Sequence, residues 1–305
     1  MANWIEEIEN NLGLTVLVAV LIGLLVPQAA ALYVFAKPIL MLMVFLAAIK
    51  MKTAEFKASF ASMPAIAAFY VLFFVALPVV AFLAVKDFLQ PDYAIALLAM
   101  LLMPAGVSTP PYAELLKGKP ELSLFTVTIT MIAAPFVVPP AMFLLTGKVA
   151  GEAVLPMFVL LAQLLAIPFA AAIAARKLFP AIVTPTRKYY SIASLALVVV
   201  LIASSLAFAA ESAKQKILGA VIPLALVFAL FLALALAGYY LFARKREERV
   251  SFGLAAFHRN YSAGIVFAGQ FLSAEALLFI VLVNIPFALA VAAYSFFLKR
   301  VNSNS

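Results

Sequence analysis

The stretch of this sequence that decides its fold reads Leu102-Met103-Pro104-Ala105-Gly106-Val107-Ser108-Thr109-Pro110-Pro111-Tyr112. It lies within a run of apolar residues long enough to cross a membrane as a helix. Pro110 and Pro111 each lack a backbone N–H and clash with the preceding turn, so the sequence predicts that the helix breaks here. Irregular backbone at membrane depth must be buried in protein or line a cavity. The stretch therefore predicts a discontinuous membrane helix.

A second interruption reads Phe257-His258-Arg259-Asn260-Tyr261-Ser262-Ala263-Gly264. Arg259 stands in the middle of an apolar run, whereas the other 20 of the 21 Lys and Arg residues fit loops or helix ends. A charge at that depth is costly and marks a functional-site hypothesis by default.

The composition around these two stretches is that of a membrane protein. The chain has 305 residues, of which 67% are hydrophobic and 11% charged. We expect an all-α polytopic membrane protein with ten transmembrane helices, at residues 12–26, 33–50, 59–85, 93–117, 121–146, 152–175, 189–210, 217–243, 250–272 and 276–298. Cysteine is absent from the sequence, which excludes disulfides and Cys-ligated metals. The net charge of +8 is ordinary for cytoplasmic loops and does not indicate a nucleic-acid partner.

Basic residues divide unequally between the two sets of loops. The loops after even-numbered segments hold 15 Lys and Arg residues, whereas the N-terminus and the loops after odd-numbered segments hold 5. The positive-inside rule then places the even loops and the C-terminus in the cytoplasm and the N-terminus outside. We expect a multi-pass protein of the cell (inner) membrane.

Ten passes divide into two groups of five, and an odd number per group inverts the second group relative to the first. We expect two five-helix repeats, at residues 1–148 and 149–305, that form one membrane domain. The two interrupted segments are then the fourth of each repeat, which is the best sequence pointer to a binding site at the membrane midplane. A weak internal echo supports this, because a shift of 151 residues lays Pro135-Phe136 on Pro286-Phe287 and Gly118 on Gly269. The same shift aligns Ser108-Thr109 with Arg259-Asn260.

Both interruptions carry a family resemblance. Residues 104–109, followed by Leu115-Leu116-Lys117-Gly118, and residues 257–262 resemble the fourth and ninth helices of the bile acid:sodium symporter superfamily. The chain is similar to a divergent bacterial or archaeal-type member. The resemblance implies two inverted repeats whose fourth and ninth helices are unwound and cross. It also implies that a panel of helices 1, 2, 6 and 7 moves against a core of helices 3–5 and 8–10.

The same resemblance implies altered sodium use. Where the family has Ser-Asn in its fourth helix, this chain has Thr109-Pro110, and the acid and the Gln of the family's ninth helix fall at Ala255 and Arg259. Arginine supplies no oxygen ligand. Ser108, Thr109 and Ser123 remain as weak sodium candidates, and the coupling ion is sodium, a proton or absent. No other metal and no organic cofactor is expected.

Arg259 has four interpretations. Its planar guanidinium binds an anionic substrate, or it takes the role of a bound sodium and holds the broken helices together. Alternatively it forms a structural salt bridge with Glu114, or it lies near the interface and snorkels to water. Glu114 is equally explained by an i,i+3 pair with Lys117.

The remaining candidates for substrate or ion binding are polar residues beside the breaks, namely His258, Asn260, Ser108, Thr109, Pro110, Ser123 and Asn284. His258 is the only histidine, and either carries a coupling proton or is a hydrogen-bonded residue at a helix end. Asn284 is typical of an interhelical contact, although its place just before Pro286 also allows it to face the crossing.

These inferences predict a secondary transporter that moves a small organic anion by alternating access, with altered or absent sodium coupling. The substrate expected is bile-acid-like or another carboxylate with an apolar body. The alternatives are a sodium-coupled symporter with noncanonical ligands and a non-transporting membrane sensor. An enzyme is disfavoured because His258 has no acid beside it and cysteine is absent. The expected partners are the organic anion and the lipid bilayer, and the oligomeric state is not predicted.

Overall fold

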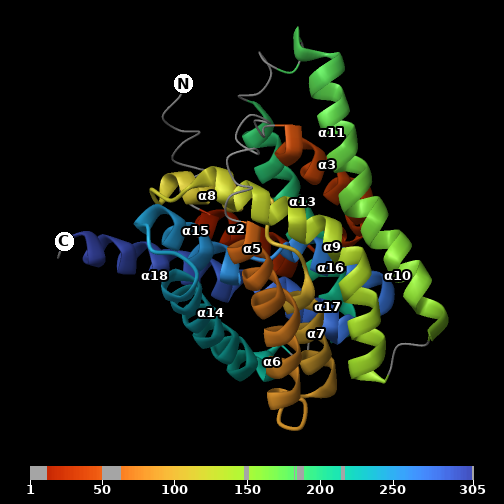
Figure 1. Ribbon diagram of the computed structural model, residues 1–305. Helices are drawn as coiled ribbons and strands as arrows, with labels where there is room; N and C mark the ends of the chain where they lie inside the picture. The colour runs from red at the N-terminus through yellow and green to blue at the C-terminus, as the bar shows by residue number, and fades with distance from the viewer. Residues whose placement is uncertain are drawn as a thin grey trace.

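The computed structural model describes residues 12–49, 63–147, 151–181, 183, 189–213 and 217–303 (Figure 1). Within these ranges every regular element is a helix, and the β pairing is limited to one isolated bridge. The predicted all-α class is confirmed. The predicted repeat boundary between residues 148 and 149 lies outside the described residues.

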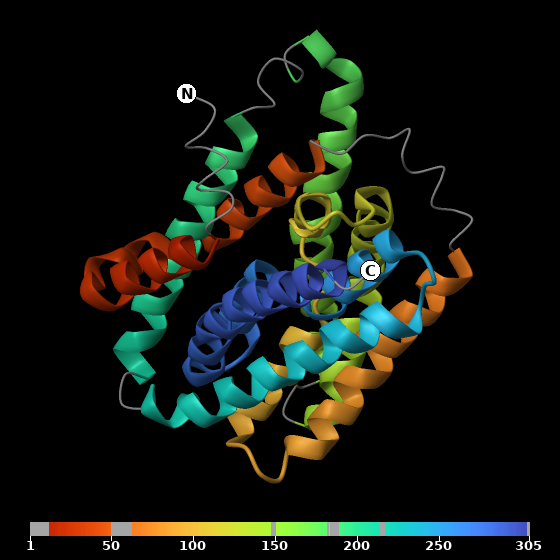
Figure 2. The ribbon, with the colours of Figure 1, turned by 90° about the vertical axis from the view of Figure 1, so that its left-hand side faces the viewer.

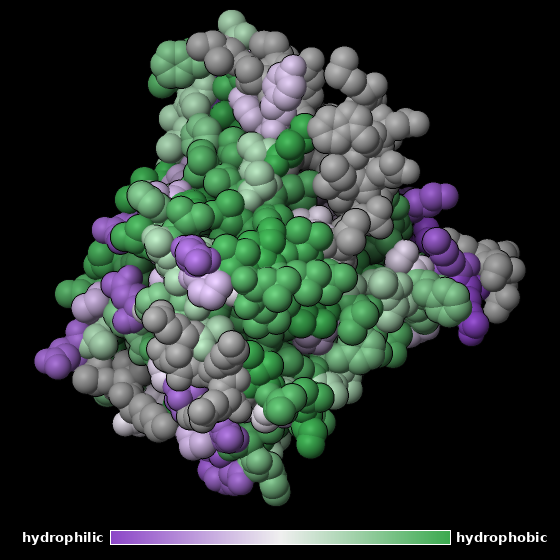
Figure 3. All heavy atoms as spheres, turned by 180° about the vertical axis from the view of Figure 1, so that it is seen from behind, coloured by the Kyte–Doolittle hydropathy of each residue, from purple (hydrophilic) through white to green (hydrophobic). Residues whose placement is uncertain are grey.

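In the part of the chain that the structure describes, seven helical runs are long and apolar enough to cross a membrane, at Pro27–Ile49, Met63–Val85, Pro120–Thr146, Gly151–Leu178, Ile192–Ala210, Leu218–Leu241 and Ala274–Val301. Large apolar side chains on these runs are exposed, for example Val34, Leu144 and Ile222, each at more than 70%. Figure 3 shows a broad continuous apolar area on one face of the molecule. Because apolar surface of that extent is unfavourable in water, it is suited to contact with lipid.

The first half of the chain forms these elements in order: α2 (Leu12–Leu25), η1 (Pro27–Phe35), α3 (Ala36–Ile49), α5 (Met63–Tyr70), η3 (Val71–Ala76), α6 (Leu77–Val85), α7 (Pro91–Leu102), α8 (Thr109–Leu115) and α9 (Pro120–Thr146). The second half forms η4 (Gly151–Ala153), α10 (Val154–Leu161), η5 (Ala162–Ala166), α11 (Ile167–Leu178), α13 (Tyr190–Ala213), η8 (Leu218–Ala220), α14 (Val221–Leu241), α15 (Arg246–Phe257), α16 (Tyr261–Phe271), α17 (Ala274–Leu282) and α18 (Asn284–Ser303). Three predicted segments are therefore short or divided helices, namely α2, α7–α8 and α15–α16.

Two groups of packed helices can be distinguished in Figure 2. Helix α13 packs against α2, η1 and α3, and α11 packs against α3. Helix α14 packs against α15 and α18, while α8 packs against α9. The two groups also meet, because α13 contacts α17 and α10 contacts α9.

Both predicted breaks are present, but the prolines of the first break have a different role from the one expected. Helix α7 ends at Leu102 and α8 begins at Thr109, so Pro110 and Pro111 lie in the first turn of α8. The first turn is where a missing N–H costs little, since its N–H groups have no partner within the helix. The prediction that these prolines stop the helix is thus wrong in detail: they start the next one.

The two breaks meet as antiparallel extended backbone. Ala105 and Arg259 form the β-bridge, in which the N–H of Gly106 donates to the carbonyl of His258 at 2.9 Å. The N–H of Asn260 donates to the carbonyl of Pro104 at 2.8 Å. The N–H of Ala105 is satisfied by the hydroxyl of Thr130 on α9, at 3.0 Å. Each break thus satisfies backbone groups of the other, which a membrane interior requires.

Candidate functional site

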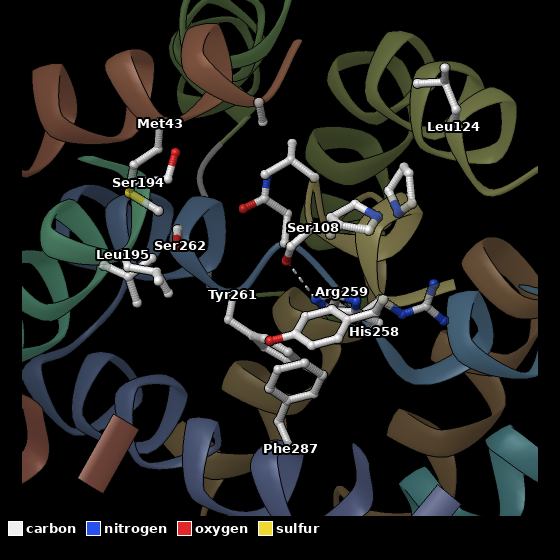
Figure 4. A pocket seen from close by; sticks show the side chains of 18 of the residues that line it. Met43, Ser108, Leu124, Ser194, Leu195, His258, Arg259, Tyr261, Ser262 and Phe287 are labelled. Carbon is white, nitrogen blue, oxygen red and sulfur yellow. Dashed lines mark hydrogen bonds between the residues drawn. The ribbon is translucent and has the colours of Figure 1, made fainter. Parts of the chain in front are cut away.

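The place where the two breaks pair is called the crossing, and a cavity of about 550 Å³ lies against it. One wall comes from α2, α3 and α13, through Val16, Met43, Ala47, Ser194, Leu195 and Val198. The facing wall comes from the two breaks and from α8, α9, α16 and α18, and includes Ser108, Tyr112, Tyr261, Ser262 and Phe287. In Figure 4, Met43 and Ser194 lie on one side of the cavity and Ser108 and His258 on the other. Its size suits a small organic molecule.

The structure brings most of the predicted site residues to this cavity. Its lining includes Ser108, Pro110, Glu114, His258, Arg259, Asn260 and Asn284. Thr109 is fully buried behind it and contacts His258. Ser123 is buried on α9, and its hydroxyl has no hydrogen-bond partner among the described residues. The three weak sodium candidates are therefore not all in the cavity wall.

Asn260 presents an unused donor at the cavity. Its side-chain oxygen caps α16 by accepting from the N–H of Ala263 at 3.0 Å. Its amide nitrogen has no hydrogen-bond partner within the described part of the chain, and the residue is only 3% exposed. A buried donor left unsatisfied is costly. An acceptor that entered the cavity would remove that cost.

His258 is held in one tautomer by two hydroxyl groups. Thr109 donates its single hydroxyl hydrogen to the carbonyl of Gly106 at 2.6 Å, so at 3.1 Å it accepts from Nδ1–H of His258. Nε2 is then an acceptor and takes the hydroxyl hydrogen of Ser108 at 3.3 Å, the contact drawn in Figure 4. The ring also stacks on Phe287, with centroids 4.7 Å apart. These contacts agree with the interpretation of His258 as a hydrogen-bonded residue at a helix end.

Arg259 is completely buried, and its side chain points away from the cavity (Figure 4). Nη2 donates to the carbonyl of Phe73 in η3 at 2.6 Å, and Cζ lies 3.6 Å from the centroid of the Phe74 ring. Figure 4 shows the guanidinium pointing away from Met43 and Ser194. The fork of Arg259 therefore lies behind the wall of the cavity and not within it.

Three of the predicted roles of charged residues are wrong. Among the described residues Arg259 makes no salt bridge with Glu114, which is exposed, and full burial also excludes snorkelling to water. Glu114 does not pair with Lys117 either; the ion pair in this region is Lys119–Glu248, at 3.1 Å. Glu114 and the partly buried Glu121 instead line the cavity.

Several site residues were not predicted from the sequence. Ser194 on α13 and Ser262 on α16 add hydroxyl groups, and Phe73 and Phe74 hold Arg259. Single serines in apolar helices carry no signal of their own, because most bond to their own backbone. The sequence does carry a signal for Phe73, namely Pro78, five residues later. A proline has no N–H to donate, so it leaves a carbonyl about one helical turn earlier without a hydrogen-bond partner.

Apolar helices of membrane length and a cavity at two paired helix breaks are features of a membrane transporter. The comparison with known families agrees with this class. The model of the sodium bile acid symporter family matches residues 37–216, which is more than half of the chain. The chain belongs to this family and is an integral, multi-pass membrane protein. A comparison with curated proteins finds no match. The matched region contains the first break and ends before the second, so the environment of Arg259 is described by the structure alone.

Proposed function

We propose that this protein is a secondary transporter of a small organic anion, a monocarboxylate with an apolar body, and that the substrate binds in the cavity at the crossing. The single observation that carries the proposal is the Asn260 amide, a buried donor with no partner in the described ranges, on the wall of a cavity of about 550 Å³. A carboxylate oxygen is a suitable acceptor for that donor.

The electrostatics of the wall support an anion. Asn260 caps the N-terminus of α16, the end of a helix that carries partial positive charge. Directly behind it lies Arg259, buried and without a carboxylate partner among the described residues. In a medium of low dielectric constant a buried charge acts over a longer distance than in water. Arg259 therefore attracts an anion through its field without touching it.

The two carboxylates of the cavity limit the charge of the substrate. Glu114 and Glu121 both line it, and like charges disfavour each other. Apolar residues such as Met43, Leu195 and Phe287 offer surface to a hydrophobic body. A singly charged carboxylate with an apolar body fits both features better than a di- or tricarboxylate.

The transport cycle that we propose uses ten helices in two inverted repeats, with the panel of α2, η1–α3, α10–α11 and α13 rocking against the core formed by the other helices. The packing of α13 on α2 and α3, and of α11 on α3, supports the panel as a unit. Because the cavity has walls from both groups, their relative motion exposes it to each side in turn. In this proposal the N-terminus is outside and the C-terminus cytoplasmic, in the inner membrane of the cell.

Asn260 offers a test that separates binding from folding. Asp and Ser both cap helices well, so Asn260→Asp and Asn260→Ser keep the α16 cap and remove the amide donor. We expect uptake of a radiolabelled monocarboxylate into proteoliposomes to fall at least about tenfold in both variants, and further in Asn260→Asp, because its carboxylate repels the anion. Near-native thermal stability of both variants is the control. Uptake unchanged in Asn260→Asp would refute an anion site at this residue.

A further inference from the structure

We propose that the guanidinium of Arg259 is a resident cation that stabilises the crossing, and that the protein consequently needs no sodium or other small cation there. The structural half of the proposal stands on the contacts of Arg259 alone. The statement that transport is independent of sodium rests additionally on the proposed function.

The acceptor of Arg259 exists because of the helical register around it. Residues Val71–Ala76 are π-helical, and the N–H of Leu77 donates to the carbonyl of Leu72, five residues earlier. In the same register the carbonyl of Phe73 requires the N–H of residue 78, which is a proline and has none. The Phe73 carbonyl is thus left without a helical partner. Nη2 of Arg259 fills that place at 2.6 Å.

The surroundings of the guanidinium favour a cation. The face of Phe74 lies 3.6 Å from Cζ, and the negative face of an aromatic ring attracts a positive charge. Helices α7 and α15 end at Leu102 and Phe257, on either side of the β-bridge, and helix C-termini carry partial negative charge. The Phe73 carbonyl and the Phe74 ring therefore stabilise Arg259 in place of a full counter-charge, while Nε and Nη1 of the guanidinium have no hydrogen-bond partner among the described residues.

Arg259 also joins three separate parts of the chain. Its backbone pairs with Ala105 in the first break, its side chain reaches Phe73 in η3, and it belongs itself to the second break. A cation at such a place holds the two breaks and the neighbouring helix together. Since Arg259 is covalently part of the chain, this cation is present at any concentration of external ions.

Lysine would be a poor substitute for this role. A guanidinium is planar, so it can lie flat on the Phe74 ring while one of its N–H groups points at the Phe73 carbonyl. A lysine ammonium is a compact and strongly hydrated point charge, which is costlier to bury. Arg259→Lys is therefore expected to recover only part of the stability that Arg259→Ala loses.

The test uses thermal unfolding of the purified full-length protein in detergent, in chloride salts of sodium, potassium and choline at equal ionic strength. We expect the wild-type Tm to be the same in all three salts. Arg259→Ala is expected to have a lower Tm, and millimolar guanidinium ion is expected to restore about half or more of the loss by occupying the vacated place.

Arg249→Ala is the matched control. Arg249 likewise donates to a backbone carbonyl, that of Ala243 at 3.0 Å, and lies over a ring, that of Tyr239 at 5.8 Å, but it is only partly buried. We expect no rescue of this variant by guanidinium ion. Rescue of both variants alike, or of neither, would overturn the resident-cation role.

Wild-type measurements keep the proposal testable even if Arg259→Ala does not fold. A wild-type Tm that rises specifically with sodium contradicts the resident cation directly. In proteoliposomes, uptake at equal rates in sodium and potassium is expected, and a strict sodium requirement refutes independence from sodium. If the protein shows no uptake in any salt while the Tm results hold, the proposed function fails and the resident cation stands.

Discussion

At the scale of single residues, Gly106 explains how closely the two breaks can approach. A Cβ at this position would lie 2.5 Å from Nε2 of His258 and 3.1 Å from the carbonyl oxygen of Arg259. Contacts that short force a neighbour to move. His258 has little room to do so, because Thr109, Ser108 and Phe287 fix its ring. Glycine is required here because the two broken segments of the chain approach each other so closely.

We therefore expect Gly106→Ala to destabilise the protein by about 1–3 kcal/mol, measured as a lower Tm. Gly219→Ala is the control, since a Cβ there would have its nearest neighbour at 3.9 Å. That variant should be neutral or slightly stabilising. Equal Tm values for the two variants would show that the ring of His258 yields easily.

At the scale of elements, the described residues contain two π-helical stretches, η3 and η5, and a proline follows each of them. Each is followed by a proline at the second position of the next helix: η3 by Pro78 in α6 and η5 by Pro168 in α11. The N–H of Ile167 donates to the carbonyl of Ala162, so the register matches that at Leu77. Only the first of the two stretches provides the acceptor for Arg259.

We expect replacement by alanine to have opposite effects on stability at Pro78 and at Pro168. Replacing a proline inside a helix by alanine ordinarily stabilises it. Pro78→Ala, however, supplies an N–H that competes with Arg259 for the Phe73 carbonyl, and we expect a loss of about 1–3 kcal/mol. Pro168→Ala should be neutral or stabilising. Thermal unfolding of both variants checks this, and a stabilised Pro78→Ala would contradict the importance of the Arg259–Phe73 contact.

At the scale of the whole molecule, the cavity has one wall from α2, α3 and α13 and the other from the crossing and its helices. The absence of cysteine from the sequence makes accessibility simple to measure, because a single introduced thiol has no competitor. Ser262 lines the cavity at the start of α16, beside Asn260.

We expect Ser262→Cys to react with a membrane-impermeant maleimide from both sides of the membrane, in right-side-out and in inside-out vesicles. This is the signature of alternating access, since one position is exposed to each side in turn. A cysteine at exposed Phe88, outside the cavity, is the one-sided control. Labelling of Ser262→Cys from one side only would argue against a transport cycle and for a static receptor.

Much of the fold can be predicted from the sequence because membrane helices are set by local composition. The apolar runs, the two breaks and the polar lining residues beside the breaks follow from the order of residues, whereas Ser194 and Ser262 do not. The helix ends at the breaks were less predictable. Pro110 and Pro111 lie in the first turn of α8, and a proline can either end one helix or start the next. Which of the two occurs depends on the hydrogen bonds of the residues that precede it.

The sequence by itself determined that the chain is helical, spans the membrane and carries a buried charge beside a broken helix, because burial of apolar residues in lipid and the geometry of proline act locally. Only the tertiary structure decided what Arg259 does. Its partners, Phe73 and Phe74, lie 186 and 185 residues away in the sequence. The direction of the Arg259 side chain therefore depends on a distant carbonyl that has no hydrogen-bond donor within its own helix. A pairing with Glu114 was reasonable from the sequence, yet the tertiary contacts stabilise this cation with a carbonyl and a ring.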